Sequence, residues 1–96
     1  MKYNITIPEA NNLKLYSKRN IWRVSPNSKK SGVYILFRNN IVMYVGESGN
    51  IMQRLYSHKN KDYWDKFTYI ELNYKDRMIA EALYIDKYKP KYNKRR

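Results

Sequence analysis

The chain has 96 residues, of which 43% are hydrophobic, and this length and composition predict one small folded domain with little room for a second core. It contains no cysteine, which excludes a disulfide framework, thiol catalysis and cysteine-ligated zinc. Its 20 lysines and arginines against eight acidic residues give a formal charge of +12, which indicates a polyanionic partner, most often nucleic acid. The N-terminus lacks the apolar core of a signal peptide, and no segment approaches the ~20 apolar residues of a membrane span. We therefore expect a cytoplasmic protein with no membrane partner.

The first 30 residues give weak local signals. Residues 5–7 are compatible with a short strand that Pro8 ends, and residues 17–24 fit either a helix capped by Ser17 or an extended segment at 21–24. Residues 25–32 are rich in serine, proline, asparagine and glycine and are predicted to form a loop. We expect residues 1–30 to be an N-terminal extension that packs on a domain formed by residues 31–96.

The following segment predicts a β-hairpin. Residues 33–37 are β-branched and aromatic and predict a strand. Residues 38–40 predict a tight polar turn, and residues 41–45 predict the antiparallel return strand. Residues 46–49 are expected to end the hairpin. Asn50 is a plausible N-cap for a helix that runs to about Lys59, with Arg54 and His58 one turn apart on one face.

The C-terminal third predicts a strand and a helix. Residues 62–65 fit a short helical turn, and residues 67–72 fit a third strand. Asp76 is expected to cap a final helix through Tyr88, which Pro90 ends. The order strand, strand, helix, strand, helix predicts the α+β class, with a small three-stranded antiparallel sheet flanked by helices.

Five short blocks carry side chains suited to phosphodiester cleavage. They are Gly32-Val33-Tyr34, Tyr44-Val45-Gly46, the helix with Arg54 and His58, Glu81 within an apolar helical stretch, and Asn93 after Lys89-Pro90-Lys91-Tyr92. Together they supply phenols, a guanidinium, an imidazole and a carboxylate, which can activate water and stabilise charge on a phosphate. Each block alone also has a structural explanation: strand packing for the tyrosines, surface charge for the arginine, and a solvated helix flank for the glutamate.

In this order and spacing, the blocks over residues 31–93 resemble the GIY-YIG nucleases. The resemblance implies that Tyr34 is the general base for the attacking water, with Tyr44 as its partner at the site. It implies that Arg54 neutralises charge in the transition state and that His58 relays or donates a proton. A free phenol has a pKa near 10, so Tyr34 needs a nearby cation or metal to act at neutral pH.

The same resemblance implies that Glu81 binds one divalent cation, Mg²⁺ or Mn²⁺, and that Asn93 contacts the scissile region or orders the site. A single carboxylate suits Mg²⁺, which keeps most of its water ligands. One departure is Glu47, which stands where some excision-repair relatives have lysine. It argues against assigning a lysine role here and offers an additional acidic group near the metal.

The expected partner is DNA. The basic C-terminal tail is expected to bind it, with residues 1–30 widening the surface; the tail residues are Lys89, Lys91, Lys94, Arg95 and Arg96. No helix-turn-helix or zinc-finger signal provides sequence recognition, so a targeting protein partner is expected, with the chain itself a monomer or weak dimer.

Three hypotheses follow. The first is a metal-dependent DNA endonuclease, encoded on a mobile element or in a small bacterial or phage genome. The second is a catalytically silent nucleic-acid-binding module, and the third is a nuclease subunit active only within a larger repair, recombination or restriction assembly. The filled Tyr34, Arg54 and Glu81 positions favour the first and third.

Overall fold

The structure, a computed structural model, describes residues 5–24 and 29–93. Its four strands form one antiparallel sheet in the order β1-β4-β2-β3, where the strands are β1 (Tyr16–Ser17), β2 (Gly32–Arg38), β3 (Ile41–Ser48) and β4 (Lys66–Glu71). The helices are α1 (Ile51–His58) and α2 (Tyr74–Tyr88), with two 3₁₀ helices, η1 (Ala10–Asn12) and η2 (Lys18–Arg23). The predicted α+β class is confirmed. β1 adds a short fourth strand, which has too few residues to show an alternating pattern in the sequence.

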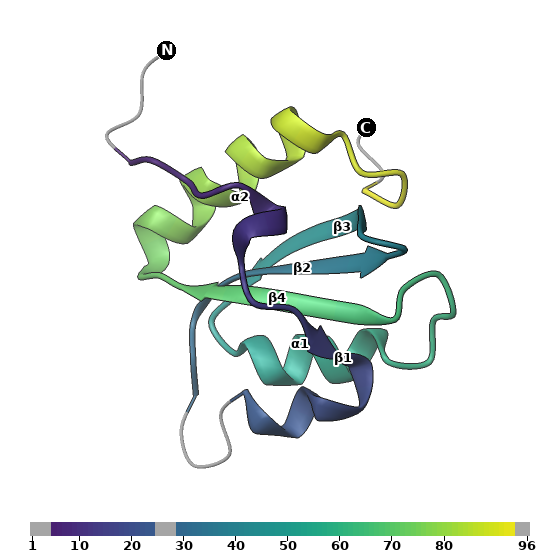
Figure 1. The fold of residues 1–96 in the computed structure, drawn as a ribbon. Coiled ribbons are helices and arrows are strands. Elements are labelled where there is room, and N and C mark those ends of the chain that lie inside the picture. The colour runs from purple at the N-terminus through teal and green to yellow at the C-terminus, as the bar shows by residue number, and fades with distance from the viewer. Residues whose placement is uncertain (1–4, 25–28, 94–96) are drawn as a thin grey trace.

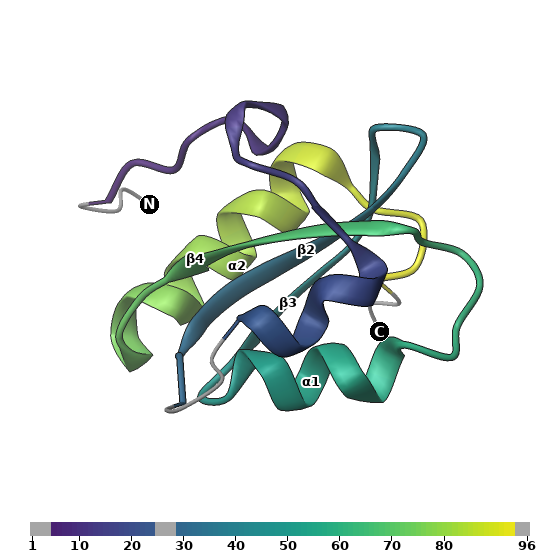
Figure 2. The ribbon, with the colours of Figure 1, turned by 60° about the horizontal axis from the view of Figure 1, so that its bottom comes forward.

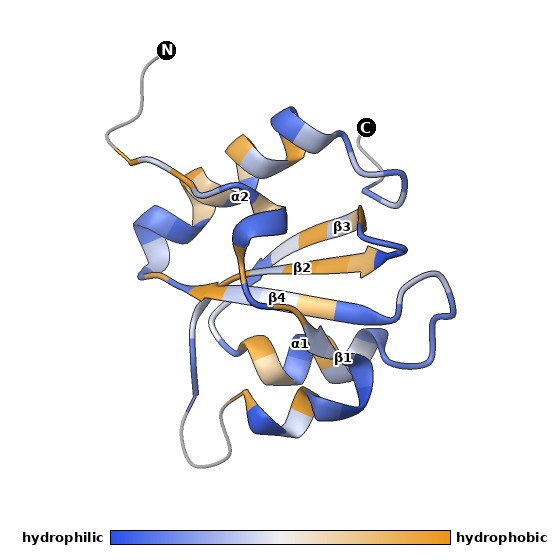
Figure 3. Cartoon of the chain, in the orientation of Figure 1, coloured by the Kyte–Doolittle hydropathy of each residue, from blue (hydrophilic) through white to orange (hydrophobic). Residues whose placement is uncertain are grey.

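The sheet is covered on both faces, with α2 on one side and α1 with η2 on the other (Figures 1 and 2). Val33, Ile35 and Phe37 of β2 pack with Ala80 and Tyr84 of α2. On the opposite face, alternate β2 residues pack in a second cluster that α1 and η2 complete; its buried members are Ile21, Val24, Tyr34, Leu36, Ile51, Leu55, Trp64 and Phe67. Successive strand residues point to opposite faces, so the central strand is buried on both sides. This explains its unbroken apolar and aromatic sequence (Figure 3).

The described N-terminal residues belong to these cores. Ala10 is fully buried in the α2-side cluster, and its backbone N–H donates to Tyr88 Oη at 2.9 Å. Tyr84 Oη in turn donates to the Pro8 carbonyl at 2.8 Å. The predicted strand at residues 5–7 is wrong: Ile5 and Ile7 pack against the α2-side cluster outside any strand. Residues 18–23 are helical, as one of the two alternatives had it, although the Ser17 side chain makes no capping bond.

The hairpin turns at Asn39 and Asn40, whose φ angles of 55° and 64° place both residues in the left-handed region. This conformation matches the right-handed twist of the flanking strands, and asparagine tolerates it well. The second strand is three residues longer than the predicted residues 41–45 and ends within the predicted segment 46–49. β3 continues to Ser48 because Gly32 of β2 pairs with Ser48, so the ladder extends past Gly46.

The helix boundaries follow from their caps. Asn50 Oδ1 accepts from the Gln53 N–H at 3.3 Å, which confirms the predicted cap of α1. The predicted Asp76 cap of α2 is wrong, because Asn73 Oδ1 accepts from the Asp76 N–H at 2.8 Å and the helix begins at Tyr74. The predicted helical turn at residues 62–65 is also wrong: this segment is a turn without a helix, with the buried Trp64 indole donating to the His58 carbonyl at 3.0 Å. Within the described part of the chain, the helices are too short or too polar to cross a bilayer.

Candidate active site

The strand register brings the two tyrosines of the hairpin together. Tyr34 lies opposite Gly46, and Tyr44 lies opposite Leu36, so the tyrosines are diagonal neighbours on the α1 side of the sheet. Their ring centroids are 6.1 Å apart. A methyl group on Gly46 would lie 2.4 Å from both Cζ and Oη of Tyr34. Gly46 therefore leaves the space that the Tyr34 phenol occupies.

His58, the last residue of α1, completes this cluster. Its Nε2 lies 3.2 Å from Tyr34 Oη, and its ring centroid is 4.8 Å from that of Tyr44. Burial, reinforced by the positive charges of Lys61 and Arg54, lowers the pKa of His58 to about 4. The imidazole is therefore neutral at neutral pH, and its Nε2 is suited to accept the Tyr34 hydroxyl proton, with its own hydrogen on Nδ1. That Nδ1 is buried without a hydrogen-bond partner.

Arg54 lies one helical turn before His58, on the exposed side of α1. Its guanidinium interacts with the Tyr34 hydroxyl, and this contact raises the pKa of Arg54. Burial, together with neighbouring Tyr44, raises the pKa of Tyr34 above its usual value even though Arg54 acts in the opposite direction. Desolvation outweighs the arginine here, so Tyr34 remains a neutral phenol in the free chain at neutral pH.

Glu81 and Asn93 meet in a second location, a groove of about 600 Å³ between α2 and the segment that follows it. Asn93 also holds the edge of β3: its Oδ1 accepts from the Val45 N–H and its Nδ2 donates to the Val45 carbonyl, both at 2.8 Å. Val45 lies between Tyr44 and Gly46 in the sequence. Asn93 thus fixes the strand segment that carries the tyrosine cluster while it lines the groove of Glu81.

The groove fits a lightly ligated cation. The described residues contain no cluster of three or more histidine, cysteine, aspartate or glutamate side chains that could hold a metal. Two carboxylates, those of Glu81 and Asp86, line the groove, and a magnesium ion that retains most of its waters needs few protein ligands. At ~30 Å³ per water, the groove has room for a hydrated cation and a phosphate.

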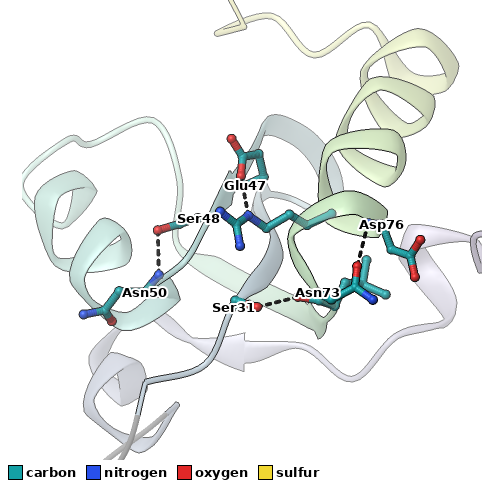
Figure 4. A network of polar contacts seen from close by, with 8 residues as sticks. Ser31, Glu47, Ser48, Asn50, Asn73 and Asp76 are labelled. Carbon is teal, nitrogen blue, oxygen red and sulfur yellow. Dashed lines mark hydrogen bonds and ion pairs between the residues drawn. The ribbon is translucent and has the colours of Figure 1, made fainter.

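Glu47 points to the α2 side of β3 and forms an ion pair with Arg77 (Figure 4). Glu47 Oε1 accepts from Arg77 Nε at 2.7 Å, and the two side chains are only 23% and 15% exposed. Arg77 precedes Glu81 by one helical turn, so the pair ties β3 to the helix that carries Glu81. The charge of Glu47 is compensated by Arg77 rather than offered to a cation. Arg77 has no local sequence signal for this role, because only the fold brings it to Glu47.

The predicted DNA-binding lysines lie on the segment after α2. Lys89 is exposed, and its ammonium is 3.7 Å from the Asp86 carboxylate. Lys91 lies over the Tyr92 ring, 5.6 Å from its centroid, and Tyr92 stacks on Tyr63 at 3.9 Å between centroids. Lys94, Arg95 and Arg96 fall outside the described residues.

The cluster combines a proton acceptor, a phenol and a guanidinium, and Asn93 links its strand to the groove that contains Glu81. These are the kinds of group that the cleavage of a phosphate ester requires. No protein-family model matches the chain. The chain is 40% identical over 74 residues to UvrABC system protein C of Fervidobacterium nodosum, an alignment that covers 67% of this chain and 13% of that protein.

Solved structures extend this comparison. A point variant of the GIY-YIG N-terminal endonuclease domain of UvrC from Thermotoga maritima, bound to its catalytic divalent cation, is 31% identical with a TM-score of 0.61. The alignment covers 70% of this chain and 86% of that domain. The magnesium-bound form of that domain is 27% identical with a TM-score of 0.65, covering 80% of this chain and 94% of the domain.

The chain therefore belongs to the GIY-YIG endonuclease family. It spans about 13% of the length of the Fervidobacterium relative, so it corresponds to a domain of that protein. The relatives found are UvrABC system proteins, and they do not support the expected phage or mobile-element origin.

Proposed function

We propose that this chain hydrolyses DNA phosphodiester bonds as a metal-dependent endonuclease, with the predicted residues Tyr34, Tyr44, Arg54, His58, Glu81 and Asn93 forming its site. The observation that carries the proposal is the 3.2 Å contact between Tyr34 Oη and His58 Nε2, with Arg54 on the same hydroxyl. These contacts support the assignment of Tyr34 and His58 to the activation of water and of Arg54 to phosphate binding.

The neutral states of Tyr34 and His58 define their roles. Tyr34 is a phenol whose pKa is raised, and His58 is an imidazole whose pKa is lowered to about 4. As a water attacks phosphorus, Tyr34 Oη accepts a proton from the water and passes its own proton to His58 Nε2. The new P–O bond forms while the P–O bond to the leaving oxygen breaks, and that oxygen takes a proton from solvent. This relay requires no free phenolate.

Arg54 controls access to this hydroxyl. The Tyr34 side chain is fully buried, whereas Arg54 is exposed and interacts with its hydroxyl. An arriving phosphate attracts the guanidinium, which can hold two phosphate oxygens in a bidentate contact. The movement of Arg54 toward the phosphate opens Tyr34 to the attacking water and neutralises the charge that develops.

Glu81 would hold the divalent cation, which when bound supplies electrostatic stabilisation to the phosphate and the leaving oxygen. The Glu47–Arg77 pair, one helical turn away, fixes the position of this part of α2. Asn93 orders the β3 edge through Val45.

The test is nicking of supercoiled plasmid with Mg²⁺ or Mn²⁺, compared with EDTA and with Glu81→Ala. Asp86→Ala is a matched control, because Asp86 is a carboxylate on the same helix that lines the same groove. We expect nicking to depend on metal, to be lost in Glu81→Ala and to persist in Asp86→Ala. Nicking in EDTA, or unchanged nicking by Glu81→Ala, would contradict the proposal.

The relation to UvrABC system protein C favours a second form of this function, in which the domain cuts DNA as part of a larger repair assembly. The observation is that the matched region is only 13% of the length of that relative. A chimera that carries this chain in place of the matched region of the Fervidobacterium protein should restore DNA incision, and its Arg54→Ala version should not. Incision by neither chimera, beside nicking by the isolated chain, would favour an independent endonuclease.

A further inference from the structure

We propose that η2 and the outer side of α1 together form a surface that binds the DNA backbone beside the active site. This surface, here called the η2–α1 face, comprises Arg19, Trp22, Arg23, Tyr56 and Lys59. The inference rests on the proposed function, because it takes DNA as the substrate. It assigns the main electrostatic contact to η2, which precedes the GIY-YIG-like blocks, and to the C-terminal end of α1, rather than to the C-terminal tail.

The first observation is the distribution of charge between the helices. η2 contributes Lys18, Arg19 and Arg23, and residues 51–61 contribute Arg54, Lys59 and Lys61, with no acidic residue in either segment. By contrast, the basic residues of α2 are matched by its acids; these are Lys75, Arg77 and Lys87 against Asp76, Glu81 and Asp86. The excess positive charge of these helices therefore lies on the α1 side of the sheet, where the Tyr34 cluster also lies.

Packing joins the two elements into one surface. Ile21 and Val24 share a buried cluster with Ile51 and Leu55 of α1, and Figure 2 shows η2 running beside α1. Lys18 Nζ donates to the Lys61 carbonyl at 2.7 Å, which ties the start of η2 to the turn after α1. The basic side chains of η2 are thus held at a fixed place relative to Arg54 and His58.

Exposed aromatic side chains give the second, independent observation. Trp22 is 53% exposed, and the Arg23 guanidinium lies 5.1 Å from its ring centroid. Tyr56 is 43% exposed, and Lys59 Nζ lies 5.3 Å from its ring centroid. Cations interleaved with open rings are the arrangement that binds phosphates while offering a stacking surface to sugars and bases.

Lys18 of η2 is held by contacts within the fold and is not part of the η2–α1 face. Burial and the positive charge of Arg38 lower the pKa of Lys18, while the carboxylates of Asp62 and Asp65 act in the opposite direction. Lys18 is therefore engaged within the fold, over the Trp64 ring at 4.3 Å and on the Lys61 carbonyl. The exposed Arg19, Arg23 and Lys59 remain as the phosphate-binding groups.

The first test measures DNA binding against salt concentration in EDTA, so that cleavage does not contribute. Arg19→Ser/Lys59→Ser should reduce the slope of log K against log[salt] by about 1.8, since each phosphate contact to duplex DNA contributes ~0.9. The control is Lys14→Ser/Lys75→Ser, which removes the same charge from exposed positions outside the η2–α1 face. It should leave the slope nearly unchanged.

The second test uses the two tryptophans. Trp64 is 1% exposed, so collisional quenching by acrylamide reports mainly on Trp22. Bound duplex DNA should shield this fluorescence from acrylamide, and the shielding should disappear in Trp22→Phe.

The outcomes separate this inference from the proposed function. Equal slope changes in the two double variants, or acrylamide access to Trp22 unaffected by bound DNA, would overturn the η2–α1 face even if metal-dependent nicking is observed. Conversely, the expected slope change and shielding without nicking would support the face and refute the proposal that the isolated chain is an endonuclease.

Discussion

Replacing Gly46 by alanine is the sharpest test of the tyrosine cluster. The added methyl would lie 2.4 Å from Tyr34 Cζ and Oη, whereas ordinary carbon contacts begin near 3.4 Å. The phenol must therefore move by about 1 Å or the strands must separate. Tyr34 is fully buried between α1 and the sheet, so neither adjustment occurs freely.

The expected magnitudes follow from this clash. Overpacking of a buried site costs about 1–3 kcal/mol. For a domain of this size, each kcal/mol lowers Tm by roughly 4–8 °C. A ~1 Å displacement of the hydroxyl from His58 Nε2 should lower the cleavage rate about 100-fold, since proton transfer depends on close alignment.

Thermal unfolding and plasmid nicking measure the two effects on one preparation. Gly49→Ala is the matched control: it is the next glycine in the chain, and its added methyl would lie 3.7 Å from the nearest neighbouring atom, on the flexible Arg77 side chain. We expect Gly49→Ala to resemble the parent in both assays. A Gly46→Ala protein with parental Tm and nicking would refute the placement of the Tyr34 ring over Gly46, and with it the Tyr34–His58 relay.

Three further predictions concern the same region. Folding lowers the pKa of His58 from an ordinary value near 6.5 to about 4, so the unfolded chain takes up the proton first as the pH falls. The free energy of unfolding should therefore be highest above pH 6.5 and fall by about 2–3 kcal/mol on acidification to pH 4.5. Urea unfolding at both pH values checks this, and His58→Phe should remove that share of the pH dependence. Asn93→Ala leaves the Val45 N–H and carbonyl without their partners and should cost about 1–3 kcal/mol by urea unfolding, whereas the exposed Lys91→Ala should be nearly neutral. Arg54→Lys keeps the charge but loses the bidentate contact, so nicking should fall at least about tenfold while DNA binding in EDTA is nearly retained; equal loss of both would assign Arg54 to general electrostatic attraction.

Much of the fold was predictable because it depends on local rules. The β-branched and aromatic residues at 33–37 and 41–45 and the two asparagines at the turn specify a hairpin without reference to the rest of the chain. Asn50 caps α1 through a bond to Gln53, three residues away. The errors at residues 5–7 and at Asp76 arose where a short apolar pattern or a neighbouring capping residue offered an equally good local alternative.

The chemical inventory of the site was also present in the sequence, because the kinds and spacing of its side chains resemble a known family. The protonation states of these side chains could not be predicted from the sequence, since burial sets the pKa values of Tyr34 and His58. The sequence also did not reveal the η2–α1 face, although the absence of acids from η2 and residues 51–61 was a readable signal.

The tertiary structure alone decided which of these residues meet. Tyr34 and His58 are 24 residues apart, Glu47 and Arg77 are 30 apart, and Val45 and Asn93 are 48 apart. Backbone preferences act over a few residues, so they specify strands, turns and caps. Contacts over such separations depend on strand register and on how two helices cover one sheet, and those are set by packing of the whole chain.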